Sequence, residues 1–239
     1  LKPYISTFYL TEVRPEHGQI IGDWLHPEWA NLRFISGEGP TAAIGDAEPQ
    51  SVPLFSAFGP TSKATRFESG AMRSWGVGLL PLGWSKFVDA PAEHYADRAV
   101  DGSLDPMLAA LAELHDIIYS GGAGGPDREV ARISAFFSGL LDKGPPDNPM
   151  IAEAHAILVD PALATVQAMA DRLAISGRTL DRLCRRAFGF PPKLLLRRQR
   201  FLRSLAENML NPDQNWVSSL DHQYYDQAHF ARDFQRFMG

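Results

Sequence analysis

The sequence has a single cysteine, Cys184, among its 239 residues. One thiol excludes an internal disulfide and any metal cluster built from several cysteines, and a reducing compartment fits it best. No apolar run approaches the roughly 20 residues that a membrane-spanning helix needs, and no secretory signal is visible at the start. We therefore expect a cytoplasmic protein without a membrane segment. The chain begins at Leu1 rather than at methionine, so we expect the natural N-terminus to lie upstream.

Patterns typical of catalytic sites are also missing. No glycine-rich stretch leads into Lys-Ser/Thr, as a phosphate-binding loop does, and no serine lies in a G-x-S-x-G context. The histidines of the first 120 residues are scattered and form no H-x-H pair, which argues against a metal site built from clustered histidines. These histidines are His17, His26, His94 and His115. We therefore expect no metal, no cofactor and no enzymatic activity.

The first hundred residues contain short apolar runs separated by glycine and proline, which is the pattern of β-strands joined by turns. The first run is aromatic and β-branched, and Trp75, Val77 and Leu79 alternate in the last. The expected strands are Tyr4–Thr11, Ile20–Trp24, Leu32–Ser36, Thr41–Ile44, Pro53–Phe58, Thr65–Glu68 and Met72–Leu80. Many short strands with frequent turns predict a barrel or a sandwich.

After about residue 100 the apolar residues recur at helical spacing. The expected helices are Leu104–Tyr119, Asp127–Leu141, Met150–Val159, Lys193–Leu210, Trp216–His222 and Asp226–Met238, besides two short helices described below. The stretch 143–149 is polar and proline-rich, which is typical of a linker. We therefore predict an α+β chain of two domains. Residues 1–142 would form a β-barrel with a helical tail, and residues 150–239 an all-α domain.

Residues 165–188 predict two short helices joined by a tight turn. Val166, Met169 and Leu173 recur at helical spacing on the first helix, and Ser176 is a good N-cap for the second. Helix, short turn and helix form the helix-turn-helix pattern, whose second helix enters the major groove of DNA. A second such pattern follows the long helix, with Gln223 in its turn.

Positive charge is concentrated around the first of these patterns. Between residues 172 and 203 the chain carries nine arginines and one lysine against a single acid, a net charge of +9. Since the whole chain has a net charge of -5 at pH 7, the remaining residues together carry -14. A basic segment in an otherwise acidic chain is typical of phosphate binding. The alternative explanation of the charge is a solvated helical face.

Four motifs in the last ninety residues match a known pattern. They are Ile175–Leu183, Phe188–Lys193, Arg200–Leu205 and Tyr224–Phe230, the last followed by Phe234 and Phe237–Gly239. In these motifs the chain resembles the AraC/XylS family of bacterial transcription regulators, whose DNA-binding domain has two helix-turn-helix units bridged by one long helix. Phe58–Pro60 and Gly76–Gly83 resemble the cupin-like β-barrel sensor domain that often precedes it. The family has glycine where this chain has Gln223, so we expect an altered turn there.

The resemblance implies a regulator that binds double-stranded promoter or operator DNA sequence-specifically. It further implies a small-molecule effector for the N-terminal domain, association with the nucleoid when bound, and RNA polymerase as a further partner, with monomer and homodimer both open. Base contacts would come from Arg178, Asp181, Arg182, Gln227, Ala228, His229, Ala231 and Arg232. Phosphate contacts would come from Ser176, Thr179, Arg185, Arg186, Arg197, Arg198 and Arg236.

The residues leave open a second function class. The chain would then be a small-molecule-binding or catalytic cupin protein whose C-terminal helices are a scaffold or a partner-docking module. Metal in the purified protein, or weak DNA binding that salt does not change, would favour this alternative.

Overall fold

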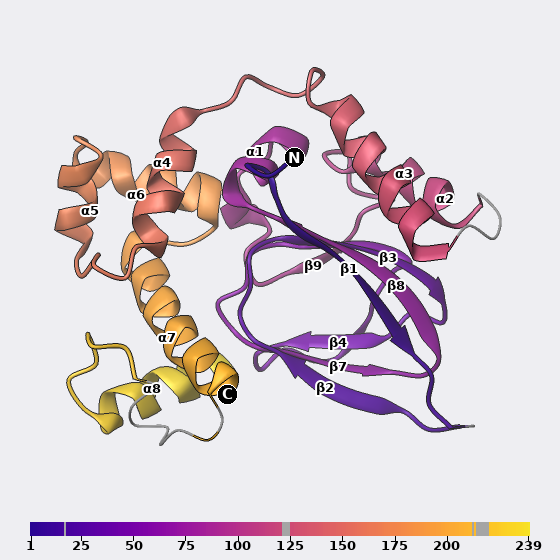
Figure 1. Cartoon of the computed structure of the whole chain (residues 1–239), viewed down its shortest axis with the longest axis horizontal. Helices are drawn as coiled ribbons and strands as arrows, with labels where there is room; N and C mark the ends of the chain where they lie inside the picture. Colours follow the sequence, from indigo (N-terminus) through magenta and orange to yellow (C-terminus); the bar gives the residue numbers. More distant parts are fainter. Residues whose placement is uncertain (17, 121–124, 212, 214–219) are drawn as a thin grey trace.

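The computed structural model describes residues 1–16, 18–120, 125–211, 213 and 220–239 of the chain. The N-terminal part contains two antiparallel sheets with helices beside them, and the C-terminal part is helical (Figure 1). This arrangement confirms the predicted α+β fold class. None of the helices in the described ranges combines the length and the apolar character that crossing a membrane requires.

The strands form one five-stranded and one four-stranded sheet, in the orders β1-β8-β3-β6-β9 and β2-β7-β4-β5. Their bounds are β1 Ile5–Val13, β2 Ile21–Leu25, β3 Asn31–Gly37, β4 Thr41–Ile44, β5 Gln50–Ser51, β6 Phe55–Phe58, β7 Thr65–Ser69, β8 Met72–Leu79 and β9 Ala99–Asp101. Each of the seven strand runs expected from the sequence contains a strand. The two short strands β5 and β9 were not predicted, because two or three residues are too few to show an alternating pattern.

Side chains alternate between the two faces of the five-stranded sheet. One face carries Phe34, Trp75 and Val77, which are buried under helices α2 (Ala109–Tyr119) and α3 (Gly125–Leu140) together with Phe137 (Figure 1). The other face packs a smaller core against the four-stranded sheet, formed by Ile35, Val52 and Phe58. Burying one such large apolar side chain contributes roughly 1.5–3 kcal/mol, so the layer under α2 and α3 is the main stabilising core of this part.

Two helices of this part differ from what the sequence predicted. Helix α2 begins at Ala109, whereas Leu104 was the expected start. The carboxylate of Asp105 accepts a hydrogen bond from the backbone N–H of Met107 at 2.8 Å, and this local turn competes with helix at that point. Helix α1 (Pro81–Phe87) was not predicted. It begins at a proline directly after β8 and buries Trp84, and its seven residues are too few for a clear helical period.

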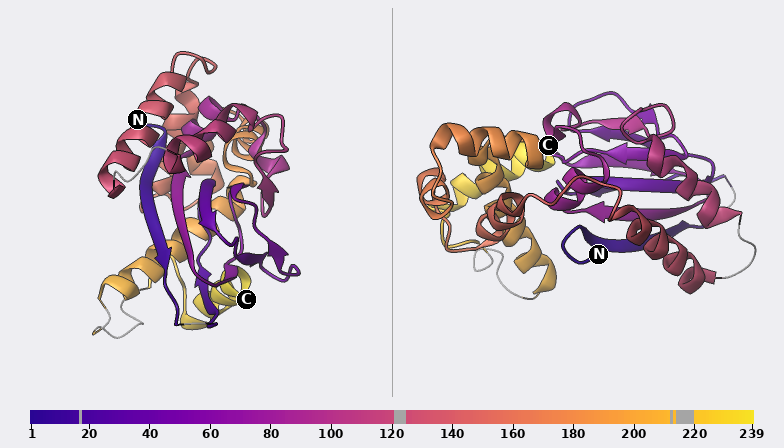
Figure 2. Two further views of the ribbon diagram at one scale, coloured as in Figure 1. Left: turned by 90° about the vertical axis from the view of Figure 1, so that its right-hand side faces the viewer. Right: turned by 90° about the horizontal axis from the view of Figure 1, so that it is seen from above.

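The C-terminal part consists of α4 (Pro149–Val159), α5 (Val166–Arg172), α6 (Gly177–Phe188), α7 (Pro192–Leu210) and α8 (Gln227–Met238). An extended segment between α3 and α4 crosses the top of the molecule to reach them (Figure 1). Helix α7 runs from α5 and α6 down to α8 (Figure 1), and the view from above in Figure 2 shows these helices beside the sheets. The helix predicted over Trp216–His222 falls mostly on residues outside those described, and 221–222 lie in a turn region.

The two parts share buried surface. Leu82 of α1 belongs to the same buried cluster as Leu180 and Phe188 of α6, and Trp29 packs against this cluster with its ring centroid 5.9 Å from that of Phe188. The segment 60–64, between β6 and β7, lies against the helices at two points. The carbonyl of Thr61 accepts a hydrogen bond from α7 at 2.7 Å, and the N–H of Ala64 donates to the carbonyl of Phe237 in α8 at 2.6 Å.

Candidate nucleic-acid interface

Helices α5 and α6 form the first helix-turn-helix unit. The hydroxyl of Thr165 caps α5, and the hydroxyl of Ser176 caps α6 by accepting from the N–H of Thr179 at 3.2 Å. Ser176 and Thr179, both predicted phosphate contacts, thus lie at the start of α6, where unpaired backbone N–H groups attract anions. The turn between the helices holds Ala174 at φ +52°, a left-handed conformation that is uncommon for a residue with a Cβ.

The buried side of this unit is apolar. Met169, Leu180 and Cys184 are fully buried between α4, α5, α6 and α7. Burial is the main reason that the pKa of the Cys184 thiol rises to about 12, with the charge of Asp181 adding to it. At neutral pH this cysteine is therefore a protonated, unreactive core residue.

The opposite side of α6 is polar and open to solvent. Arg178 and Arg182 are exposed, and among the described residues neither forms an ion pair. Asp181 is paired with Arg185 at 2.8 Å, one helical turn further along. In this geometry Asp181 orients the side chain of a neighbouring arginine.

The last turn of α6 lies beside the N-terminal part. Arg186 is 3.9 Å from Asp89, which follows α1, and both side chains are more than half exposed. A pair this exposed contributes about 1 kcal/mol or less and is readily exchanged. Arg186 therefore remains available to a stronger anion such as a phosphate.

Helix α8 corresponds to the second helix predicted for the second helix-turn-helix unit, and we refer to α8 with the described residues 220–226 before it as the second unit. Asp226 caps it by accepting from the N–H of His229 at 2.7 Å, and Phe237 stacks on Phe201 of α7 with ring centroids 5.1 Å apart. Most of the predicted contact residues are exposed on this helix, namely Gln227, Ala228, Ala231, Arg232 and Arg236. His229 is only partly exposed, and its Nε2 accepts a hydrogen bond from Arg200 at 3.1 Å, since a guanidinium can only donate.

A buried carboxylate fastens α8 to α7. Asp233 is fully buried and accepts hydrogen bonds from Arg197, from Arg200 at 3.2 Å and from the hydroxyl of Tyr224 at 3.0 Å. Arg197 was predicted to contact phosphate, and its guanidinium is instead ion-paired with Asp233. Asp233 was not among the residues predicted to form the site. The signal was present, because Asp233 falls within the apolar stripe formed by Phe230, Phe234 and Phe237, where a charge needs a buried partner.

The prediction that Arg198 contacts phosphate is wrong for this structure. Its side chain is only 1% exposed, and it lies between the two parts of the molecule. The guanidinium donates to the carbonyls of Thr61 at 2.7 Å and Glu28 at 3.3 Å, and it stacks on Trp29 at 4.0 Å from the ring centroid. Burial lowers the pKa of Arg198 to about 10, so the group stays charged at neutral pH. A phosphate can reach it only if the parts separate.

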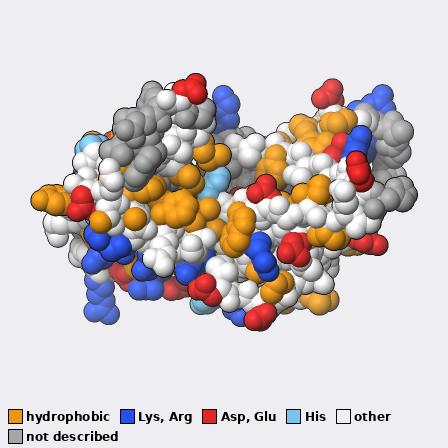
Figure 3. All heavy atoms as spheres, turned by 90° about the horizontal axis from the view of Figure 1, so that it is seen from below, with side chains coloured by type: hydrophobic (Ala, Val, Ile, Leu, Met, Phe, Trp, Pro, Cys, Tyr) orange, Lys and Arg blue, Asp and Glu red, His pale blue; other side chains and the backbone are white. Residues whose placement is uncertain are grey.

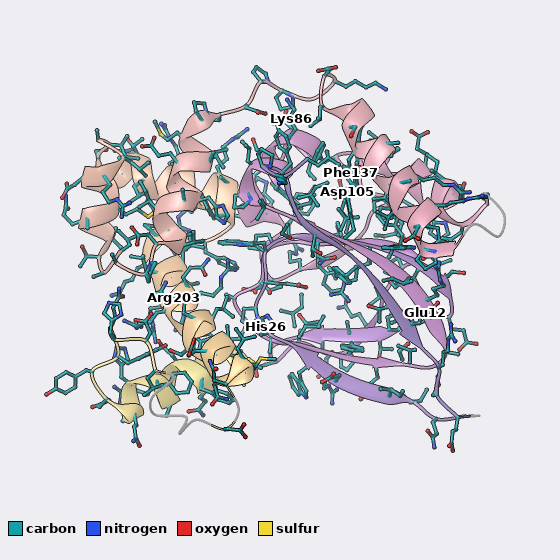
Figure 4. All side chains as sticks on the ribbon, in the orientation of Figure 1. Glu12, His26, Lys86, Asp105, Phe137 and Arg203 are labelled. Atoms are coloured by element: carbon teal, nitrogen blue, oxygen red, sulfur yellow. The ribbon has the colours of Figure 1, made fainter. Side chains whose placement is uncertain are left out.

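A cavity of about 340 Å³ opens beside Arg198 at the boundary of the two parts. Its walls are mostly apolar and come from β1, β3, the segment before β3, and α7. Two buried polar atoms lie in side chains that line it and have no hydrogen-bond partner among the described residues, Nε of Arg198 and Oδ1 of Asn31. His26, labelled in Figure 4, also lines this cavity, on the side of the sheets that faces α7.

The surface of the helical part is uneven in charge. Figure 3, a view from below, shows Lys and Arg side chains along the outer edge of the helical part and hydrophobic side chains where it meets the sheets. A second hollow of about 450 Å³ lies between the start of α5, helix α7 and the start of α8. The basic side chains that line it are Lys193, Arg197, Arg200 and His229.

Within the described part of the chain, no group of three or more His, Cys, Asp or Glu side chains is arranged to hold a metal ion.

The fold and this basic surface together define a class: an antiparallel β domain followed by a helical domain that contains a helix-turn-helix unit and a second candidate reading helix. Solved structures of ToxT from Vibrio cholerae have the same two-domain fold. A 1.65 Å structure of ToxT matches with a TM-score of 0.51 and 9% identity over 97% of this chain and 94% of that chain. The apo K231A variant of ToxT from strain SCE256 matches at 0.50, with 9% identity over 97% and 93% of the two chains.

The AraC-like transcriptional activator CuxR is also similar, with a TM-score of 0.29 and 15% identity over 84% of this chain and 82% of that chain. No protein-family model matches the sequence, and no curated protein matches it. The likeness to ToxT therefore confirms the fold, including the order of its two domains.

Proposed function

We propose that the chain is a sequence-specific DNA-binding transcription regulator of the AraC/XylS type. The exposed face of α6 carries the proposal. Arg178 and Arg182 lie there without an acidic partner among the described residues, while the other face of the helix is packed in the core. A capped helix with free arginines on its outer side is suited to the major groove, where arginine binds guanine O6 and N7.

Substituting Arg182 tests this proposal. Arg182→Ala is expected to weaken binding to the selected DNA sequence by roughly 1–3 kcal/mol and to relax base preference at one position. Selection from a random duplex pool, followed by titration of the enriched sequence, measures both effects. Arg14→Ala is the matched control, because it removes one exposed arginine from the sheet domain. Equal losses of affinity for all DNA sequences would show that Arg182 contacts a phosphate and not a base.

The salt dependence of binding separates the regulator from the scaffold alternative. A protein that neutralises about 6–10 phosphates loses roughly 10³–10⁵ in affinity between 50 and 200 mM salt. Weak binding that salt leaves unchanged would contradict the proposal and favour a small-molecule-binding protein.

We also propose that the cavity beside Arg198 is an effector site. Its apolar walls and the unpaired Nε of a buried arginine favour a small molecule with an apolar body and an anionic head. A ligand there contacts both domains, so it can change their relative arrangement and thereby DNA affinity. RNA polymerase as a partner, the domain limits at 142 and 150, and association with the nucleoid remain parts of the same proposal.

Sodium decanoate is a suitable probe of this cavity. At a concentration of about ten times its Kd, a carboxylate that binds only the folded protein stabilises it by about 1.4 kcal/mol, which is measurable as a rise in the melting temperature. Decanol, which has the same chain length without the charge, is expected to give a smaller rise. Equal shifts with both compounds would show that Arg198 does not recognise the head group.

A further inference from the structure

The side chain of Gln223 connects the second helix-turn-helix unit to the first. Its Nε2 donates hydrogen bonds to the carbonyls of Pro161 at 2.8 Å and Leu163 at 3.2 Å. Both carbonyls belong to the loop between α4 and α5, whereas Gln223 lies four residues before the start of α8. Gln223 is also not among the described residues with positive φ, so its side chain, and not a left-handed turn, is the distinctive feature of this position.

Both ends of this connection are fixed. On the second unit, the N–H of Gln223 donates to the carboxylate of Asp221 at 2.9 Å, and Arg203 of α7, labelled in Figure 4, donates to the same carboxylate at 2.6 Å. On the first unit, Leu163 is buried in the core, 3% exposed. A short side chain that joins two fixed backbones acts as a brace.

The brace lies to one side of α7. Helix α7 alone joins the two units end to end, and the Asp233 contacts hold α8 against it. Neither contact links the second unit directly to the start of α5. The hollow lined by Lys193, Arg197 and Arg200 lies between the units, and Gln223 lines it as well. The two bonds from Gln223 therefore restrain how far the units tilt across this hollow.

We infer that Gln223 is a positioning residue that sets the spacing between the two DNA half-sites, an inference that rests on the proposed function. Successive half-sites on one side of the duplex lie about 34–36 Å apart, or 10–10.5 base pairs. Adding one base pair moves the second half-site by about 3.4 Å and rotates it by roughly 34° around the axis. Two units that are held rigidly therefore accept one spacing, and two units that tilt accept several.

The experiment compares three duplexes with the wild-type chain and with Gln223→Ala. The half-sites are those enriched from a random pool, and the spacing is the selected one, one base pair shorter or one base pair longer. Two hydrogen bonds of about 1 kcal/mol each correspond to a factor of about 10–30 in preference for the selected spacing. Gln223→Ala is expected to lose most of this preference while its preference for each half-site sequence is unchanged.

Two further variants separate the brace from a general structural role. Gln223→Met keeps the length without the donor and is expected to behave as Gln223→Ala. Gln223→Lys restores a donor and is expected to recover the spacing preference, whatever its added charge does to affinity on all duplexes. An unchanged spacing preference in Gln223→Ala, or equal weakening on all three duplexes, would overturn the inference. If the wild-type chain enriches no sequence at all, the proposed function fails, and the inference fails with it.

Discussion

Replacing Arg198 with alanine is expected to lower the free energy of unfolding by about 3 kcal/mol. The change removes a charged donor from the carbonyls of Thr61 and Glu28 and leaves a cavity beneath Trp29. Since these contacts lie between the two parts of the molecule, the lost free energy weakens the association of the two parts. Denaturation of the full chain with guanidinium chloride, followed by tryptophan fluorescence, measures the change.

Arg198→Met is the matched control. Methionine fills much of the same space and removes the cost of burying a charge, so we expect a loss of about 1 kcal/mol. The difference in unfolding free energy between the two variants separates the contribution of side-chain volume from that of the hydrogen bonds. An alanine variant that unfolds at the wild-type denaturant concentration would show that Arg198 does not hold the two parts together in solution.

Asp233→Ala is expected to detach α8 and to cost about 4 kcal/mol locally, because it leaves two guanidinium groups and a buried hydroxyl without their acceptor. The second unit then no longer presents Gln227 and Arg232 in a fixed orientation. Selection from a random duplex pool should enrich one half-site instead of two. Gln235→Ala, on the exposed side of the same helix, is expected to enrich both half-sites. Two half-sites with Asp233→Ala would contradict the role of this carboxylate.

The same carboxylate makes the helix sensitive to acid. Burial by itself raises the pKa of Asp233, but the hydrogen bonds from Arg197, Tyr224 and Arg200 outweigh it and hold the pKa below its ordinary value. A carboxylate with a lowered folded-state pKa stabilises the protein fully above its unfolded pKa, about 3.9, and the stabilisation is lost as the pH falls through the folded pKa. Melting temperatures of the wild-type chain should therefore fall more steeply below about pH 4 than those of Asp233→Asn. Parallel curves would show that the pKa of Asp233 is the same in the folded and the unfolded protein.

Local signals in the sequence predicted most of the fold. Ser176 before an apolar stripe predicted the start of α6, and the structure ends this helix at Phe188, directly before Gly189 at φ +83°. Seven strands were predicted from apolar runs alone. The predicted start of α2 was wrong because the carboxylate of Asp105 accepts a hydrogen bond from the backbone N–H of Met107, and periodicity does not measure this local competition with helix.

The candidate site was predictable only where it faces solvent. Arg178 and Arg182 were predicted to contact bases, and the structure exposes both. Arg198 was assigned to the same surface because its residue type suggested phosphate. Its position in α7, three residues from Leu195 and from Phe201, both fully buried, indicated the core instead. The partner that buries it, Trp29, is 169 residues earlier in the chain, and no local pattern predicts a contact across that separation.

The segment 60–64 contacts both helix-turn-helix units, through Pro60 beside Gly189 at the end of α6 and through Ala64 to the end of α8. Two linked modules bind a double site with an affinity that grows with the product of their separate affinities. A displacement of this one segment that weakens each module about tenfold would therefore weaken the double site by about a hundredfold. Under the proposed function, five residues in the β domain are thus placed to turn a small local movement into a steep change in DNA binding.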